Sequence, residues 1–164
     1  MPESKELATA AAFTLTPCVV AGFGGWLALE SEEESSFWKR IKKPSWAPQN
    51  LLLYSVADVA VTLPFGYASY LIYEKGLENS DVKTALAVYG ATHLASLSCL
   101  PAISRQNLRW MSASALCTTA AATATAYLFG KIDQTAGRLA IPFAALCAFY
   151  AVFSFGAEND RAAS

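Results

Sequence analysis

Residues 110–130 read WMSASALCTTAAATATAYLFG and contain no Asp, Glu, Lys or Arg. A water-soluble helix would carry polar side chains on its outward face at a 3.6-residue period. Here the Ser and Thr residues are scattered around the helix, so no face of it is convincingly solvated. A helix of roughly 20 such residues crosses a hydrocarbon layer about 30 Å thick. The stretch therefore predicts a transmembrane helix.

Four other stretches of the chain are equally poor in charge. Lipid offers no partner to free backbone N–H and C=O groups, so such stretches are expected to be helical. We predict an all-α polytopic membrane protein, a bundle of five transmembrane helices in contact with lipid. It forms a single domain over residues 1–164, with helices at about 7–29, 50–73, 83–103, 110–130 and 138–157 and a loop at 30–49.

The composition excludes several functional classes. Charged residues make up 15% of the chain, against about 25% in soluble proteins, and 54% is hydrophobic. Twelve Lys and Arg against thirteen Asp and Glu leave no basic excess for a phosphate backbone, so we expect no nucleic-acid partner. A single His, no metal-ligand spacing and no glycine-rich phosphate loop indicate no cofactor, no metal and no catalytic site. We predict that the protein is not an enzyme.

The loop at 30–49 combines basic and aromatic residues. An acidic run is followed by FWKRIKK at 37–43 and PSWAP at 44–48. A short helix here would place Phe37, Trp38 and Ile41 on one face and the basic side chains on the other, along the membrane surface. The segment either anchors the chain at the interface or covers a ligand as a lid.

Two ionisable residues fall at membrane depth. Asp58 lies seven residues past Leu51 in the second predicted helix, and His93 lies near the midpoint of the third. Because these helices run antiparallel, the two residues lie at depths about 5 Å apart and can form a hydrogen bond if their faces meet. Intramembrane acids face an interior, a partner or water. Asp58 and His93 either anchor a ligand or a proton-linked step, or stabilise helix packing.

Small residues recur at every fourth position of the third predicted helix, at Ala87, Ala91 and Ala95. In lipid, close backbone approach supplies the energy of helix association. This face is expected to pack tightly, either on another helix of the chain or on a second chain in a homodimer. In the second predicted helix, Pro64 removes a backbone hydrogen bond and is expected to produce a kink.

Residues 37–48, FWKRIKKPSWAP, and residues 66–71, GYASYL, resemble the TspO/MBR (translocator protein, peripheral-type benzodiazepine receptor) family. FTLTP at 13–17, ALAVY at 85–89 and RLAIPF at 138–143 are similar to it as well. The resemblance implies a five-helix bundle with an apolar cavity beneath the first loop that binds cholesterol, porphyrins or haem. It also implies residence in the outer mitochondrial membrane of a eukaryote or in a bacterial membrane.

The resemblance also assigns site residues. Pro44, Ser45 and Trp46 match the motif that roofs the cavity. The matching lining positions are Gly25, Ala28, Leu53, Val56, Trp110, Ala113, Cys117, Leu146, Tyr150 and Phe153, to which we add Asp58 and His93.

Several aromatic residues of the family pattern are replaced in this chain. The Asn-Trp-x-Trp-Pro of its third helix appears here as LSCLP at 97–101. The second-helix Trp aligns with Ala57 or Asp58, and the fifth-helix Trp with Leu146. Each lost ring pair removes about 0.5–1.5 kcal/mol of possible stacking with an aromatic ligand.

Three functions follow from these patterns. The first is a membrane protein that binds or transports sterols or tetrapyrroles. The second is an adaptor that keeps the fold but not the ligand and assembles partners through the small-residue helix face. The third, a porphyrin-degrading enzyme, requires indole side chains in the cavity, and most of these are replaced.

Overall fold

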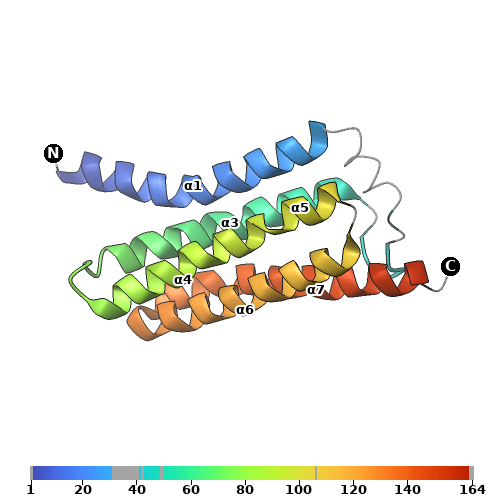
Figure 1. Cartoon of the computed structure of the whole chain (residues 1–164). Helices are drawn as coiled ribbons and strands as arrows, with labels where there is room; N and C mark the ends of the chain where they lie inside the picture. Colours follow the sequence, from blue (N-terminus) through green and yellow to red (C-terminus); the bar gives the residue numbers. More distant parts are fainter. Residues whose placement is uncertain (1, 31–40, 42, 49, 106, 163–164) are drawn as a thin grey trace.

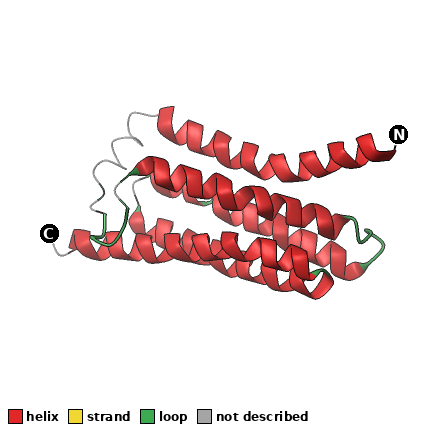
Figure 2. Ribbon diagram, turned by 180° about the vertical axis from the view of Figure 1, so that it is seen from behind, coloured by secondary structure: helices red, strands yellow, loops and turns green. Residues whose placement is uncertain are grey.

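The computed structural model describes the backbone of the chain except residues 1, 31–40, 42, 49, 106 and 163–164. The side chains of residues 2–3, 20–21, 23–30, 51, 103–104 and 158–162 also lie outside the description. Within the described ranges every regular element is a helix (Figure 2). The helices are α1 (Pro2–Glu30), α3 (Leu51–Tyr73), α4 (Ser80–Leu97), α5 (Cys99–Ser104), α6 (Leu108–Ile132) and α7 (Gln134–Ala162). The all-α prediction is confirmed.

The third predicted helix is divided into α4 and α5 at Ser98. Pro101 has no N–H to donate to the carbonyl of Leu97, so one backbone hydrogen bond of a regular helix is missing at this point. Ser98 ends α4 by donating its hydroxyl to the carbonyl of Ala95, at 2.6 Å. In contrast, α3 continues as a single helix through Pro64.

The long helices lie side by side, and the two ends of the chain lie at opposite ends of the bundle (Figure 1). The contacts between elements run in the order α4, α6, α7, α3 and α1, with the most extensive contact between α6 and α7. Helix α1 packs mainly on α3. This arrangement puts α3 directly against α7 although more than 60 residues separate them in the sequence.

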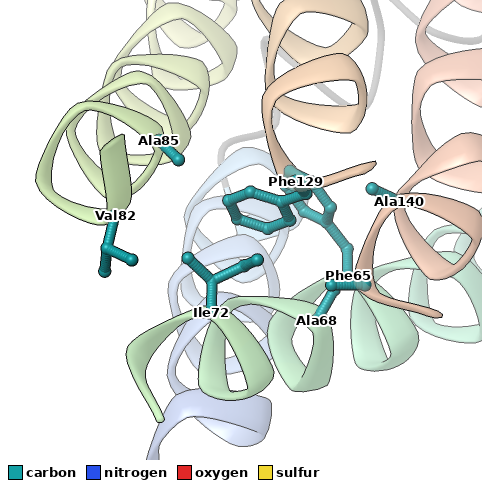
Figure 3. Packing of buried hydrophobic residues seen from close by; sticks show 8 residues of the cluster. Phe65, Ala68, Ile72, Val82, Ala85, Phe129 and Ala140 are labelled. Atoms are coloured by element: carbon teal, nitrogen blue, oxygen red, sulfur yellow. The ribbon is translucent and has the colours of Figure 1, made fainter. Parts of the chain in front are cut away.

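The apolar core lies among α3, α4, α6 and α7. Phe65 and Ile72 of α3 point toward Phe129 of α6, and Ala140 of α7 lies close by (Figure 3). The ring of Phe65 stacks on that of Phe143 with centroids 4.2 Å apart. This core occupies the half of the bundle that contains the α3–α4 and α6–α7 turns. A second, smaller cluster lies at the other end and consists of Ala102, Leu108 and Met111, with Ile41 and Cys99 packed against it.

The outer surface of the bundle is apolar. Three segments are long and apolar enough to cross a membrane, Leu52–Tyr73, Ser80–Ala102 and Gln134–Ala157. Large apolar side chains such as Leu52, Leu94 and Val152 are exposed on them. Large apolar side chains exposed in this number are unfavourable in water and favourable in lipid. The chain is therefore an integral membrane protein, and crossing of the membrane by α1 and α6 stays a prediction.

The four threonine hydroxyls of helix α6 are satisfied within the helix. Thr118, Thr119, Thr123 and Thr125 each donate a hydroxyl to the carbonyl four residues earlier, at 2.7–2.9 Å. Two hydroxyl pairs also join α6 to α4 and its C-terminal cap. Thr92 pairs with Thr125 at 2.9 Å, and the cap Ser98 pairs with Ser114 at 2.6 Å. Such bonds contribute about 0.6 kcal/mol each on average in membranes.

Side-chain caps fix the helix ends at the turns. Asn50, Asn79 and Asn107 accept hydrogen bonds from the first turns of α3, α4 and α6. Asp133 does the same for α7, and its second oxygen forms an ion pair with Lys75 at 2.8 Å. The ion pair joins the α3–α4 turn to the α6–α7 turn.

We predict that Gly137→Ala destabilises the α6–α7 pair. A Cβ at this position would lie 2.5 Å from Cα and 2.8 Å from N of Gly130, so the helices must separate. Such overpacking costs about 1–3 kcal/mol in the free energy of unfolding, measurable by SDS titration in mixed micelles. Gly90→Ala is the matched control, because a Cβ there meets no atom within 4 Å. Equal stability of the two variants would contradict the close α6–α7 packing.

We predict that Asp133→Ala costs about 0.5–2 kcal/mol through loss of the helix cap, and that Asp133→Asn costs less because the amide oxygen still caps α7. The hydrogen bond from Lys75 and the backbone N–H of Ala136 lower the pKa of Asp133 below its ordinary 3.8. A lowered folded-state pKa gives stability that is present above pH 4 and lost as the pH falls through the folded pKa. The difference between wild type and Asp133→Ala should therefore shrink in acid, and a constant difference would contradict the ion pair.

Candidate functional site

The end of the first loop is seated on α7. Pro44 and Ala47 form a tight turn in which the Ala47 N–H donates to the Pro44 carbonyl at 2.9 Å, and both residues are buried. A Cβ on Gly156 of α7 would lie 2.7 Å from Cγ of Pro44. The glycine therefore allows the loop to approach the helix backbone closely. This contact fixes where Trp46 lies over the bundle.

Beneath this loop, five aromatic rings from three segments are in contact. Trp46 meets the ring of Phe149 edge-on, with centroids 5.8 Å apart. Tyr54 of α3 contacts three rings of α7, and its hydroxyl donates to the carbonyl of Pro48 at 2.8 Å. We call this cluster the aromatic shelf. Its members are Trp46, Tyr54, Phe149, Tyr150 and Phe153.

A carboxylate borders the aromatic shelf. Asp58 lies one helical turn after Tyr54, and its Oδ1 accepts a hydrogen bond from the Tyr150 hydroxyl at 2.7 Å. The side chain is half-buried, and within the described part of the chain it has no ion-pair partner and no second hydrogen bond. An acid at membrane depth costs about 2.5–3.5 kcal/mol on insertion scales. One tyrosine hydroxyl offsets part of that cost.

The hydrogen bond considered between Asp58 and His93 does not form. Asp58 faces α7, because α3 packs far more extensively on α7 than on α4. His93 lies instead among aromatic rings of the core, 4.6 Å from the ring of Tyr89 and 5.7 Å from that of Phe65, centroid to centroid. The fifth predicted helix, and not the third, supplies the partner of the acid.

The structure brings some of the predicted site residues together and leaves others apart. Trp46, Tyr150 and Phe153 belong to the aromatic shelf, and Tyr150 bonds there to Asp58. Pro44 holds the loop on α7 at Gly156, and half-buried Leu146 lies one turn before Tyr150. The remaining described residues of the predicted lining and roof, apart from His93, are exposed, namely Ser45, Leu53, Val56, Trp110, Ala113 and Cys117. The side chains of Gly25 and Ala28 lie outside the described residues. A cavity lined by the full set stays a prediction.

Trp110 contacts Arg105 and, within the described part of the chain, makes no ring contact with the aromatic shelf. The guanidinium of Arg105 lies 5.8 Å from the centre of its ring. This is within the range of a cation–π interaction, so this indole is engaged at the start of α6.

The small-residue face of α4 points outward. Ala87 and Ala91 are exposed and Ala95 is half-buried. The buried face of the helix is a different one, formed by Val82, Ala85 and Thr92. Packing of Ala87 and Ala91 on a second chain stays a prediction.

Sequence reasoning missed Tyr54, Phe149 and Gly156. Tyr54 and Asp58 are four residues apart, which places both on one face of α3. Phe149, Phe153 and Gly156 follow the corresponding spacing on α7. These spacings are visible in the sequence, but they also fit ordinary helix packing, and nothing in the sequence states that these two faces meet.

A shallow hollow of about 370 Å³ lies elsewhere, along one face of α1. Its lining is Ala8, Ala11, Ala12, Leu15, Thr16 and Val19. The Thr16 hydroxyl donates to the carbonyl of Ala12 at 2.6 Å, so it is already engaged within the helix. The hollow offers no free polar group to orient a ligand, and we place the candidate site at the aromatic shelf.

The sequence model of the TspO/MBR family matches residues 13–158, nearly the whole length of the chain. The chain belongs to the TspO/MBR family. The matched range contains every residue of the aromatic shelf and Asp58. Members of the TspO/MBR family are in general membrane proteins that bind or transport ligands without catalysing a reaction.

We predict that Tyr150→Phe lowers the free energy of unfolding by about 0.5–1.5 kcal/mol, because Asp58 then has no donor in the described bundle. In an Asp58→Asn background the same substitution should cost less, and the difference is the coupling between the two side chains. SDS titration of the wild type, the two single variants and the double variant measures this coupling. Tyr127→Phe on the exposed face of α6 serves as the matched control. Zero coupling would contradict the bond.

Proposed function

We propose that this TspO/MBR protein binds and transports an apolar ligand of the sterol or tetrapyrrole class at the aromatic shelf. The observation that supports this most directly is the seating of the first loop on α7, which holds Trp46 against the ring of Phe149 in the shelf that Asp58 borders. The ligand would enter between the loop and the helices and lie on the rings.

The chemistry of the shelf suits such a ligand. Aromatic rings offer large apolar surfaces with polar atoms at one edge, and one or two placed polar groups are sufficient to fix the orientation of a ligand. Trp46 is 52% exposed, so its ring retains free surface for a partner. The exposed side chains of Leu53 and Val56 on α3 would extend the apolar surface.

A specific observation also favours an adaptor as the second candidate. Ala87 and Ala91 form an outward small-residue face on α4, and a Cβ on Gly90 between them meets no atom within 4 Å. Another helix could approach this face closely, either from a second copy of the chain or from a partner protein. Porphyrin breakdown has weaker support, since Trp46 is the one indole that the described contacts place at the shelf.

We predict that Trp46→Ala weakens sterol or porphyrin binding about tenfold, because the ring and its contact with Phe149 are lost together. The measurement is binding to the full chain in nanodiscs, by scintillation proximity for tritiated cholesterol and by the Soret band for protoporphyrin IX. Neither readout uses tryptophan fluorescence, which the substitution itself would change.

Tyr127→Ala is the matched control for this experiment. It removes an exposed ring near the far end of α6, where Lys131 lies 4.7 Å from the ring centre. Saturable binding that Trp46→Ala weakens and Tyr127→Ala does not would support the proposal. The absence of saturable binding of either ligand would contradict it and favour the adaptor.

A further inference from the structure

We infer that the ligand of the aromatic shelf carries an ammonium group at one end of its apolar body, and that this group binds the free oxygen of Asp58. The inference rests on the proposed function and adds to it the charge of the ligand. It is carried by one juxtaposition, a carboxylate with one unused oxygen beside a cluster of aromatic rings.

The carboxylate of Asp58 has one oxygen committed and one available. Oδ1 accepts the hydrogen bond from Tyr150, which fixes the orientation of the group. Oδ2 makes no hydrogen bond or ion pair with the described residues, and it is not among the buried polar atoms without a partner. An open carboxylate oxygen is thus present in a helix that passes through the apolar layer.

The described surroundings of Asp58 supply no positive charge. Its nearest titratable neighbours are Tyr54, Cys147 and Tyr150, and none of these carries a cation. The ion pair between Lys75 and Asp133 lies at the other end of the bundle. Intramembrane acids pair with a cation where one is available, and here a bound ligand would supply it.

The aromatic shelf favours the same ligand chemistry. A cation is attracted to the faces of Trp and Tyr rings, and sites for organic ammonium groups combine such rings with an acid. The rings of Tyr54 on α3 and Tyr150 on α7 are nearly parallel, with centroids 6.2 Å apart. Tyr54 lies one turn before Asp58, and Tyr150 bonds to it. Trp46 and Phe149 continue the apolar surface toward the loop.

Of the two ligand classes in the proposed function, the same geometry favours the sterol-like one. The carboxylates of a porphyrin would meet Asp58 with like charge in a layer where charge is poorly screened. A sterol hydroxyl could donate to Oδ2, but it brings no countercharge. An amine on the same apolar body donates a hydrogen bond and supplies the charge as well.

A matched pair of ligands tests the inference. Cholesterol and 3β-aminocholest-5-ene share one ring skeleton and differ in a hydroxyl against an ammonium group. Their affinities are measured on the full chain in phosphatidylcholine nanodiscs, after subtraction of partition into empty nanodiscs. For the wild type we expect the amine to bind about tenfold more tightly than cholesterol. Asp58→Asn should bring this ratio close to one.

Two further variants make the result specific to the site. Asp58→Glu keeps the carboxylate and should retain a clear preference for the amine. Asp133→Asn removes an acid at the other end of the bundle and should leave the preference unchanged. The wild-type ratio is itself a test that does not depend on the folding of any variant.

The outcomes separate the two proposals. If cholesterol binds but the wild type shows no preference for the amine, or if the preference persists in Asp58→Asn, the ammonium inference is overturned and the proposed function stands. If neither sterol binds saturably, the ammonium inference is overturned, and the proposed function is overturned with it only if protoporphyrin IX also fails to bind. A preference that depends on the Asp58 carboxylate supports both.

Discussion

The structure depends on helices whose outer surfaces are apolar. Because lipid is as apolar as the side chains, burial of apolar area cannot by itself hold such helices together. Backbones must therefore approach closely, as they do at Gly66 against Phe13 and Thr14 and at Gly137 against Gly130. Hydroxyl pairs add directional contacts between the same helices. These contacts hold neighbouring helices together along the bundle.

The candidate site lies at one end of the bundle. The larger core cluster, which includes Phe65 and Phe129, lies near the short turns, whereas the first loop lies over the opposite half of α3 and α7. Gly156 lets Pro44 reach α7, and Trp46 is placed over Phe149 as a result. A bundle that admits a ligand from one side is expected to be well packed at one end and covered by a loop at the other.

Asp58 connects the fold with the proposed ligand chemistry. Its bond to Tyr150 joins α3 to α7 at the point where the aromatic rings meet. The same bond leaves one carboxylate oxygen facing away from its partner. A group that contributes to packing through one oxygen can also select a ligand through the other, and this explains how an acid in an apolar helix can be useful despite its insertion cost.

The sequence by itself determined the helical class and the family. Each of these depends on local composition or on a contiguous motif such as PSWAP at 44–48, and neither requires knowledge of which helices are neighbours. The tertiary structure alone decided which helix faces meet. Asp58 was within reach of His93 by depth, yet it bonds to Tyr150, 92 residues away along the chain. Depth along a helix follows from residue count, whereas rotation about the helix axis is set by packing against neighbours, which no single helix contains.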